Sequence, residues 1–151
     1  MATNSFEIAK KANYVLLKKT ERKLYFYHDD EILKSYRVSL GKQPDGHKLR
    51  NGDSRTPEGV YTLDWRNPNS KYFRSIHISY PNLSDRRGAE ERGDSPGGAI
   101  MIHGQSKSWA ERSRLLFHGN DWTEGCVAVQ DHEILEIWEM VDDGITIEIL
   151  P

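Results

Sequence analysis

The sequence has 151 residues but only one cysteine, Cys126, so no disulfide can form within the chain. A chain of this length buries about 68–70% of the surface that its unfolded form exposes, enough for one hydrophobic core with a cleft. Neither disulfides nor a structural metal are therefore needed for stability. Three roles are left for Cys126: a small buried side chain, a metal ligand or a reactive thiol.

Long apolar stretches are also missing, because no uninterrupted run of apolar residues exceeds four. A membrane-spanning helix needs about 20 such residues, and a signal peptide needs an apolar region of about 7–15. The sequence thus predicts no membrane span and no leader in the chain as given, which leaves cytoplasm and periplasm both open. With a mean hydropathy of −0.74, residues 1–151 are expected to form one soluble domain, with residues 1–12 as a poorly ordered or helical extension.

Net charge is small, at −2, but it is unevenly distributed. Residues 1–55 carry 12 Lys or Arg against 7 acids, whereas residues 121–151 carry 9 acids and no Lys or Arg. A nucleic-acid-binding domain usually has a dominant basic footprint, so this balance argues against nucleic acid as a partner. The acidic tail is interpreted as a solvated helix face near an acidic site rim.

Short segments rich in β-branched and aromatic residues recur along the chain, and turn residues at 28–31 and 43–46 separate some of them. They predict a mostly β fold: a single sandwich or barrel domain with one or two short helices. The expected strands are Tyr14–Leu17, Lys23–His28, Ile32–Leu40, Gly59–Leu63, Ile76–Tyr80, Ala99–His103, Cys126–Val129 and Ile145–Leu150.

Asp131–Val141 is predicted to be a helix, because four apolar side chains recur at i, i+3, i+4 and i+7 and share one face. Asp131 is expected to be its N-cap. Ser106–Phe117 is a weaker helical candidate. Ser84–Gly98 is rich in glycine and charged residues and is expected to be an exposed loop. The four apolar residues of the first helix are Ile134, Ile137, Trp138 and Val141.

A histidine and the cysteine each lie at the end of an apolar strand, beside a glycine. His103 precedes Gly104, and Cys126 follows Gly125. An imidazole close to a thiol can take its proton and leave a strong nucleophile. A glycine before the nucleophile allows a tight turn whose amides could point at a developing oxyanion.

Two alternatives stand beside this interpretation. A lone cysteine in an apolar strand is most often a small buried side chain, and His103 could be a hydrogen-bonded core residue. Zinc could also be held by His103, His118 and Cys126. Their spacings of 15 and 8 residues match no short zinc signature, so no metal site is predicted.

The order His-Gly followed by Thr-x-Gly-Cys-Val, with Arg55-Thr56-Pro57-Glu58-Gly59-Val60-Tyr61 upstream, resembles the YkuD-type L,D-transpeptidase catalytic domain. The resemblance runs from about Tyr14 to Leu150. It implies that Cys126 is the nucleophile, His103 its base, and the Gly104 carbonyl the group that orients the imidazole.

The same resemblance implies that Thr123 helps to shape the cleft and that the amides of Glu124, Gly125 and Cys126 form the oxyanion hole. The thiolate would attack a peptidoglycan stem tetrapeptide and form a thioester, with no cofactor. An amine of another stem, or of an envelope lipoprotein, would then complete a cross-link, whereas water would give hydrolysis. The protein is expected to act as a monomer in the periplasm or cell wall, with a secreted effector as the alternative.

The motif departs from the commoner family pattern at two positions. Glu124 takes the place of a histidine and Ala128 the place of an arginine, as in a subgroup with an Asp-Trp-Thr-x-Gly-Cys-x-Ala motif that includes enzymes cutting peptidoglycan–protein links. Together with Asp121, this change predicts a cleft that favours a cationic group in the substrate. The alternative is that Glu124 is a solvent-facing loop residue.

Two neighbouring side chains have open roles. His118 is either a second imidazole in the cleft or a loop histidine bonded to backbone. Trp122 either stacks on substrate or anchors its loop. For the whole chain, three functions remain: an L,D-transpeptidase, a hydrolytic relative, or a non-catalytic peptidoglycan-binding module. The intact His103 and Cys126 favour an enzyme.

Overall fold

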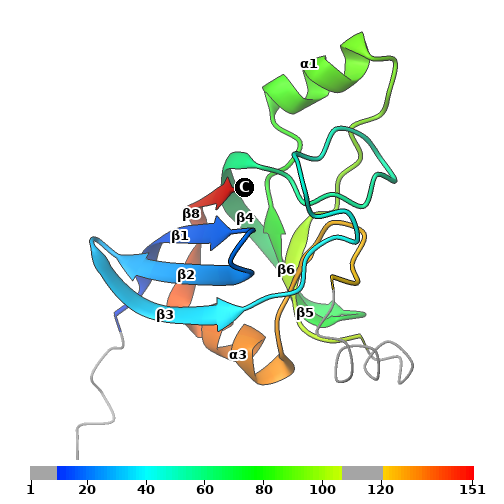
Figure 1. Ribbon diagram of the computed structural model, residues 1–151. Coiled ribbons are helices and arrows are strands. Elements are labelled where there is room, and N and C mark those ends of the chain that lie inside the picture. The colour runs from blue at the N-terminus through cyan, green and yellow to red at the C-terminus, as the bar shows by residue number, and fades with distance from the viewer. Residues whose placement is uncertain (1–9, 107–120) are drawn as a thin grey trace, which may run out of the picture.

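The computed structural model describes residues 10–106 and 121–151 and contains one curled, eight-stranded sheet (Figure 1). The strand order is β3-β2-β1-β8-β4-β5-β6-β7. This confirms the mostly β fold that the sequence predicts. The strands are β1 (Ala12–Lys18), β2 (Lys23–His28), β3 (Glu31–Arg37), β4 (Gly59–Ser70), β5 (Phe73–Ile78), β6 (Met101–His103), β7 (Val127–Ala128) and β8 (Val141–Leu150).

The first three strands form an antiparallel meander whose alternation was readable from the sequence. Val15 pairs with Phe26, and both side chains are fully buried. β3 ends at Arg37 instead of the predicted Leu40, and beyond it Ser39 makes an isolated bridge to Ala128. The chain therefore leaves the meander and runs directly toward the strand that follows Cys126.

β8 lies in the middle of the sheet, parallel to β1 and antiparallel to β4. Its Ile147 lies opposite both Val15 and Tyr61 and is fully buried. The last strand of the described chain is thereby held between segments that are distant in sequence. This arrangement joins the meander to the strands that carry the candidate site.

The other half of the sheet brings the two predicted site strands together. β6 pairs antiparallel with β5, and β7 pairs parallel with β6, with His103 opposite Ala128. Cys126 directly precedes β7, so the cysteine and the histidine lie at one edge of the sheet. β4 extends to Ser70, beyond the predicted Leu63, because it forms a long hairpin with β5 that contains two register shifts.

The predicted C-terminal helix is confirmed as α3 (Asp131–Met140), which buries Ile134 and Ile137 against the sheet. Its N-cap is Gln130 and not Asp131, because Gln130 has the extended backbone and its amide donates to the Glu133 carboxylate. Asp131 lies one position later, in the first turn, and accepts a hydrogen bond from the Gln105 amide.

The prediction of an exposed loop over Ser84–Gly98 was wrong, since α1 (Leu83–Glu91) occupies its first half and projects from the sheet (Figure 1). The physical reason is a capping box in which the Asn82 side chain accepts from the Asp85 amide and the Asp85 carboxylate accepts from the Asn82 amide. Asp85 also bonds His47 and Tyr61, which fastens the helix to the body.

Several predictions fall on residues outside the described ranges. They are the helical candidate Ser106–Phe117, nearly all of which lies there, His118, and residues 1–9 of the expected extension. Ala12, the last residue of that extension, begins β1. No helix within the described ranges has both the length and the apolar character to cross a membrane.

Candidate active site

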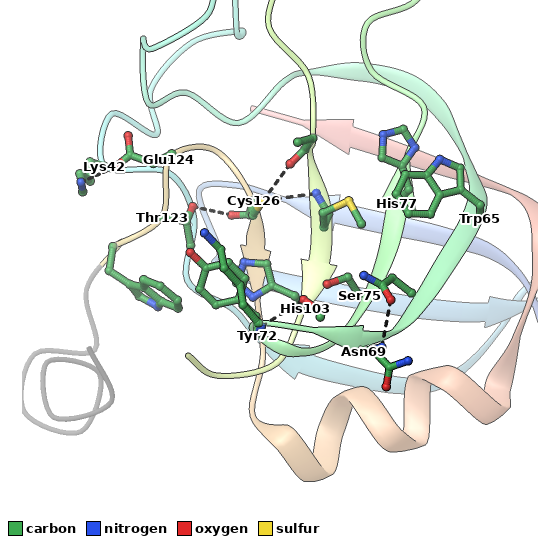
Figure 2. Close-up of a pocket in the computed structure, with 16 residues that line it drawn as sticks. Lys42, Trp65, Asn69, Tyr72, Ser75, His77, His103, Thr123, Glu124 and Cys126 are labelled. Carbon is green, nitrogen blue, oxygen red and sulfur yellow. Dashed lines mark hydrogen bonds and ion pairs between the residues drawn. The ribbon is translucent and has the colours of Figure 1, made fainter. Parts of the chain in front are cut away.

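A cleft of about 650 Å³ lies over strands β4, β5 and β6, and both His103 and Cys126 line it (Figure 2). His103 comes from the end of β6, and Cys126 comes from the turn before β7. Of the remaining predicted site residues, Trp122, Thr123 and Glu124 also line this cleft. The sequence motif and the cavity therefore coincide.

The thiol of Cys126 has two backbone neighbours at the start of β6. Its Sγ lies 3.3 Å from the carbonyl oxygen of Ala99 and 3.4 Å from the amide nitrogen of Met101. Because a carbonyl oxygen can only accept, the thiol must supply the hydrogen in the first contact. The geometry thus describes a neutral thiol that donates to Ala99 and accepts from Met101.

Electrostatics point the same way. Burial raises the pKa of the Cys126 thiol above its ordinary value, and the Met101 amide opposes this only in part. A raised pKa means that little thiolate is present at neutral pH. A neutral thiol would need a nearby base in order to act as a nucleophile.

His103 is suited to be that base. Its ring is 1% exposed, and Nδ1 lies 2.7 Å from the carbonyl oxygen of Gly104. A carbonyl cannot donate, so Nδ1 carries a hydrogen, and in a neutral imidazole the basic lone pair is then on Nε2. The Tyr72 ring stacks on the imidazole with centroids 4.2 Å apart, and Trp122 meets it edge-on at 5.8 Å. The imidazole is therefore fixed in both tautomer and orientation.

Gly104 has a packing reason to be glycine. A Cβ built there would lie 2.7 Å from Oδ1 of Asp131 and 3.0 Å from the carbonyl oxygen of Tyr72. Its own amide donates to the carbonyl of Arg74 in the neighbouring strand. The backbone at Gly104 is held on two sides, so the carbonyl that faces His103 has a defined direction.

The turn before Cys126 is organised by Thr123. The Thr123 hydroxyl donates to the Cys126 carbonyl at 2.8 Å and accepts from the Gly125 amide at 3.1 Å. Gly125 has a φ of +138°, and a Cβ there would approach the Arg55 carbonyl oxygen to 2.6 Å. Of the three amides expected to form an oxyanion hole, that of Gly125 is bonded to Thr123 in this structure.

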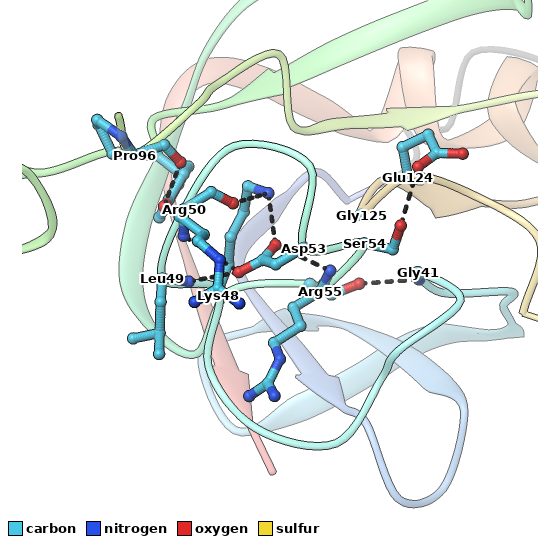
Figure 3. Close-up of polar contacts among 12 residues, drawn as sticks. Gly41, Lys48, Leu49, Arg50, Asp53, Ser54, Arg55, Pro96, Glu124 and Gly125 are labelled. Atoms are coloured by element: carbon cyan, nitrogen blue, oxygen red, sulfur yellow. Dashed lines mark hydrogen bonds and ion pairs between the residues drawn. The ribbon is translucent and has the colours of Figure 1, made fainter. Parts of the chain in front are cut away.

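The backbone against which Gly125 packs belongs to residues 41–58, a long connection built around a buried ion pair (Figure 3). Lys48 Nζ lies 2.9 Å from Oδ1 of Asp53, and both side chains are almost completely buried. Asp53 also accepts hydrogen bonds from the backbone amides of Leu49, Arg50 and Arg55. These bonds set the path of Ser54 and Arg55 beside the Cys126 turn.

Burial disfavours the charge of Asp53, but the Lys48 ammonium and the three amides outweigh it and lower the pKa of Asp53 to about 2. The next residue, Ser54, donates to the Glu124 carboxylate at 2.9 Å. Lys42 forms an ion pair with the same carboxylate. The connection therefore holds the Cys126 turn through both its backbone and its side chains.

The expected acidic character of the cleft is not supported. Asp121 lies outside the cleft lining and forms a bidentate ion pair with Arg22, at 2.9 Å for the shortest contact. Ala128 is buried and does not line the cleft. Glu124 is solvent-facing and paired with Lys42. Both local acids are thus paired with basic neighbours, and Glu124 fits the alternative of a solvent-facing loop residue. A cationic group in the substrate stays a prediction.

Sequence reasoning missed an aromatic lining of the cleft. Tyr72, at the tip of the β4–β5 hairpin, covers His103, and Trp65 stacks on His77 with centroids 4.6 Å apart and planes at 13°. Trp65 and His77 pair across a hairpin with irregular register, so no local motif could have joined them. The one available signal was that the alternation of the predicted strand Gly59–Leu63 continues as far as Trp65.

A metal centre finds no support in the part of the chain that the structure describes. No three His, Cys, Asp or Glu side chains gather there as they would around an ion. The zinc alternative also required His118, which lies outside that part. Tyr72 and Trp122, the side chains around His103, are aromatic rather than metal ligands.

Comparison with known proteins adds the family. The L,D-transpeptidase catalytic domain, YkuD, matches residues 12–149. YafK of Escherichia coli K12, provisionally named an L,D-transpeptidase, is 31% identical over 139 residues, which are 87% of this chain and 48% of YafK. The chain thus spans about half the length of this curated relative.

Solved structures agree in fold. Pgp2 of Campylobacter jejuni, a helical cell shape determining protein, is 26% identical with a TM-score of 0.67, covering 93% of this chain and 48% of Pgp2. An L,D-transpeptidase of Mycobacterium smegmatis shares the fold at 14% identity and a TM-score of 0.60, covering 93% of this chain and 59% of its own. The family match extends over nearly the whole chain and both site strands, and the chain belongs to the L,D-transpeptidase (YkuD) family.

Proposed function

We propose that the chain is a cysteine-dependent L,D-transpeptidase that acts on peptidoglycan stem tetrapeptides through a thioester. The observation that carries the proposal is the hydrogen bond from His103 Nδ1 to the Gly104 carbonyl, in the same cleft as the single thiol. It leaves Nε2 as the base that a neutral thiol requires. Family membership supports the reaction class.

In the first step, the Cys126 thiol gives its proton to His103 Nε2 as Sγ bonds to the carbonyl carbon of the L-centred residue, usually diaminopimelate. Amides of the turn around Glu124 and Cys126 stabilise the oxyanion that forms. The bond to the terminal D-alanine then breaks, and the imidazolium returns the proton to the departing amine. A thioester on Cys126 remains.

The acceptor decides the product. An amine from another stem or from an envelope lipoprotein gives a new amide, and water gives a carboxylate. Hydrolysis is the second candidate, as an L,D-carboxypeptidase, endopeptidase or amidase that cuts lipoprotein links. The Asp121–Ala128 motif of the cutting subgroup favours it. A non-catalytic peptidoglycan-binding module is the third, and the ordered tautomer of His103 argues against it.

The substrate sets the compartment. Peptidoglycan lies outside the cytoplasmic membrane, so the proposed location of the protein is the periplasm or cell wall. The alternative is that the protein is secreted and acts as an effector. A role in cell shape comes to this chain from its likeness to Pgp2. Cell fractionation with an antibody to the protein distinguishes these locations.

The test incubates the protein with tetrapeptide muropeptides, with and without an amine acceptor, and with lipoprotein-linked sacculi. Mass spectrometry is expected to find an acyl adduct on Cys126, followed by dimers for transfer, or by tripeptides or freed lipoprotein for cutting. Cys126→Ala should form no adduct. His103→Ala should slow acylation by about 10²–10⁴-fold, the usual contribution of a general base.

His28→Ala is the matched control, because His28 Nδ1 also bonds a backbone carbonyl, that of Lys11, but lies outside the cleft lining. It should acylate at the wild-type rate. Activity that survives in Cys126→Ala, or a wild-type protein that alters none of these substrates, would overturn the proposal.

A further inference from the structure

One end of the cleft has an exposed aromatic platform. Trp65 of β4 and His77 of β5 stack in parallel, and 49% of Trp65 is exposed although it lines the cavity. Figure 2 shows the pair on the opposite side of Cys126 from Lys42 and Glu124. A large apolar surface left exposed inside a cleft is typical of a ligand-binding site.

The platform is held rigid before any ligand arrives. His77 Nδ1 lies 2.6 Å from Oδ1 of Asp64, and the His77 side chain is largely buried. The imidazole covers one face of the indole, so the exposure of Trp65 belongs to its other face and edge. A flat side chain fixed in this way loses little conformational entropy on binding.

The surroundings of the platform are mainly polar, although Lys71 also lines the cleft and the Asp64 carboxylate is bonded to His77. Asn67, Asn69 and Ser70 line the same cavity, and Asn67 Oδ1 accepts a hydrogen bond from the backbone amide of Asn69 at 2.9 Å. Side-chain amides both donate and accept hydrogen bonds. Among the described residues that line the cleft, Glu124 is the one acid, and it lies at the opposite end.

This chemistry fits a sugar ring better than an ammonium group. A pyranose has an apolar C–H face that can lie on an indole, and its hydroxyl and acetamido groups pair with amides. A cation can also lie over an indole ring, but the nearby Asp64 carboxylate is already bonded to His77, and the cleft lining carries two positive side chains, Lys42 and Lys71. A flat aromatic face beside neutral amides therefore selects for carbohydrate.

We propose that Trp65, backed by His77, binds an N-acetylated amino sugar of the glycan strand to which the stem peptide is attached. This rests on the proposed function, because it identifies which part of peptidoglycan enters that end of the cleft. The amino end of the stem peptide, which joins the glycan, then lies toward Trp65. Substrates that retain their sugars bind more tightly than free peptides.

The test measures binding in the Cys126→Ala background, where no turnover occurs. Isothermal titration compares the disaccharide tetrapeptide with the free tetrapeptide. The disaccharide form is expected to bind about tenfold more tightly, the gain that one aromatic stacking contact of about 1.4 kcal/mol gives. Adding Trp65→Ala should abolish this difference and leave the affinity for the free tetrapeptide unchanged, whereas Trp65→Phe should keep part of it.

Ile32→Ala is the control, because Ile32 is an exposed apolar residue of β3 outside the cleft lining, and it should change neither affinity. Thermal unfolding of each variant verifies that it folds. Equal loss for both ligands in Trp65→Ala, or no loss for either, overturns the sugar subsite. Sugar-dependent binding through Trp65 without turnover by the wild type would instead contradict the proposed function alone.

Discussion

At the scale of single residues, the state of the Cys126 thiol determines how the site can work. The thiol donates to the carbonyl of Ala99, whose backbone φ of +55° is one that residues other than glycine rarely adopt. Local strain of this kind is often found at functional sites. The thiol hydrogen is directed at a backbone carbonyl, so in the proposed mechanism the imidazole has to take this proton during attack.

The first prediction concerns the pH dependence of this thiol. Since burial raises the pKa of Cys126, alkylation by iodoacetamide without substrate should be slower in the folded than in the unfolded protein at pH 7. Its midpoint should lie above about 8.5, the ordinary thiol value. Intact-mass kinetics between pH 6 and 10 measure this. A midpoint below that of the unfolded chain would reveal a thiolate–imidazolium pair instead of a neutral thiol.

The residues that the sequence could and could not predict differ in how far their partners lie along the chain. His103, Gly104, Gly125 and Cys126 were found because each pair is adjacent and the glycines have local geometric roles. The ion pair of Asp121 with Arg22 joins positions 99 residues apart, and no local sequence pattern indicates it. For that reason the sequence could not indicate that Asp121 is paired outside the cleft lining.

At the scale of elements, the connection over residues 41–58 supports the turn before Cys126. Its centre is the buried pair of Lys48 and Asp53, and its backbone at Arg55 leaves room only for a glycine at position 125. Removing one partner of a buried ion pair leaves the other charge uncompensated. The stability of this element should therefore depend on the ionisation of Asp53.

The second prediction follows from the pKa of Asp53, which is lowered to about 2. The unfolded value is about 3.9, and each pKa unit corresponds to about 1.4 kcal/mol. The stabilisation is fully present above the unfolded pKa and is lost as pH falls through the folded one. Wild type should therefore lose about 2–3 kcal/mol more than Asp53→Asn between pH 6 and pH 2.

Urea unfolding at both pH values measures the difference, with Asp30→Asn as the control. Asp30 is an exposed carboxylate in the turn between β2 and β3, and its replacement should leave the pH dependence of the wild type in place. If Asp53→Asn and wild type lose the same free energy of unfolding, the pair does not stabilise the connection.

The helices show what capping signals contribute to prediction. The apolar periodicity of Asp131–Met140 was sufficient to find α3, although its N-cap was misplaced by one residue. α1 has only one buried residue, Ala89, so it has no apolar stripe to detect. Its signal was the spacing of Asn82 and Asp85, a capping box that precedes a charged segment rather than an apolar one.

At the scale of the whole molecule, the order of the strands in the sheet could not be predicted from the sequence. Alternation predicted each strand separately, yet β1 pairs with β8, more than 120 residues away. Alternation places a side chain on a face of a strand but does not identify the neighbouring strand. Because β8 lies between β1 and β4, the meander and the site-bearing strands share one core, to which Val15, Tyr61 and Ile147 all belong.

The last prediction tests this shared core. Ile147→Ala should lower the free energy of unfolding by about 2–5 kcal/mol, because it leaves a cavity between β1 and β4. Val60→Ala is the matched control: Val60 is next to Tyr61 in β4 but 60% exposed, and it should cost less than about 0.5 kcal/mol. Circular dichroism of the sheet and thiol accessibility of Cys126 should give one urea midpoint in each protein, since a single core unfolds cooperatively. Two separate midpoints would mean that the β1–β3 meander unfolds independently of the candidate site.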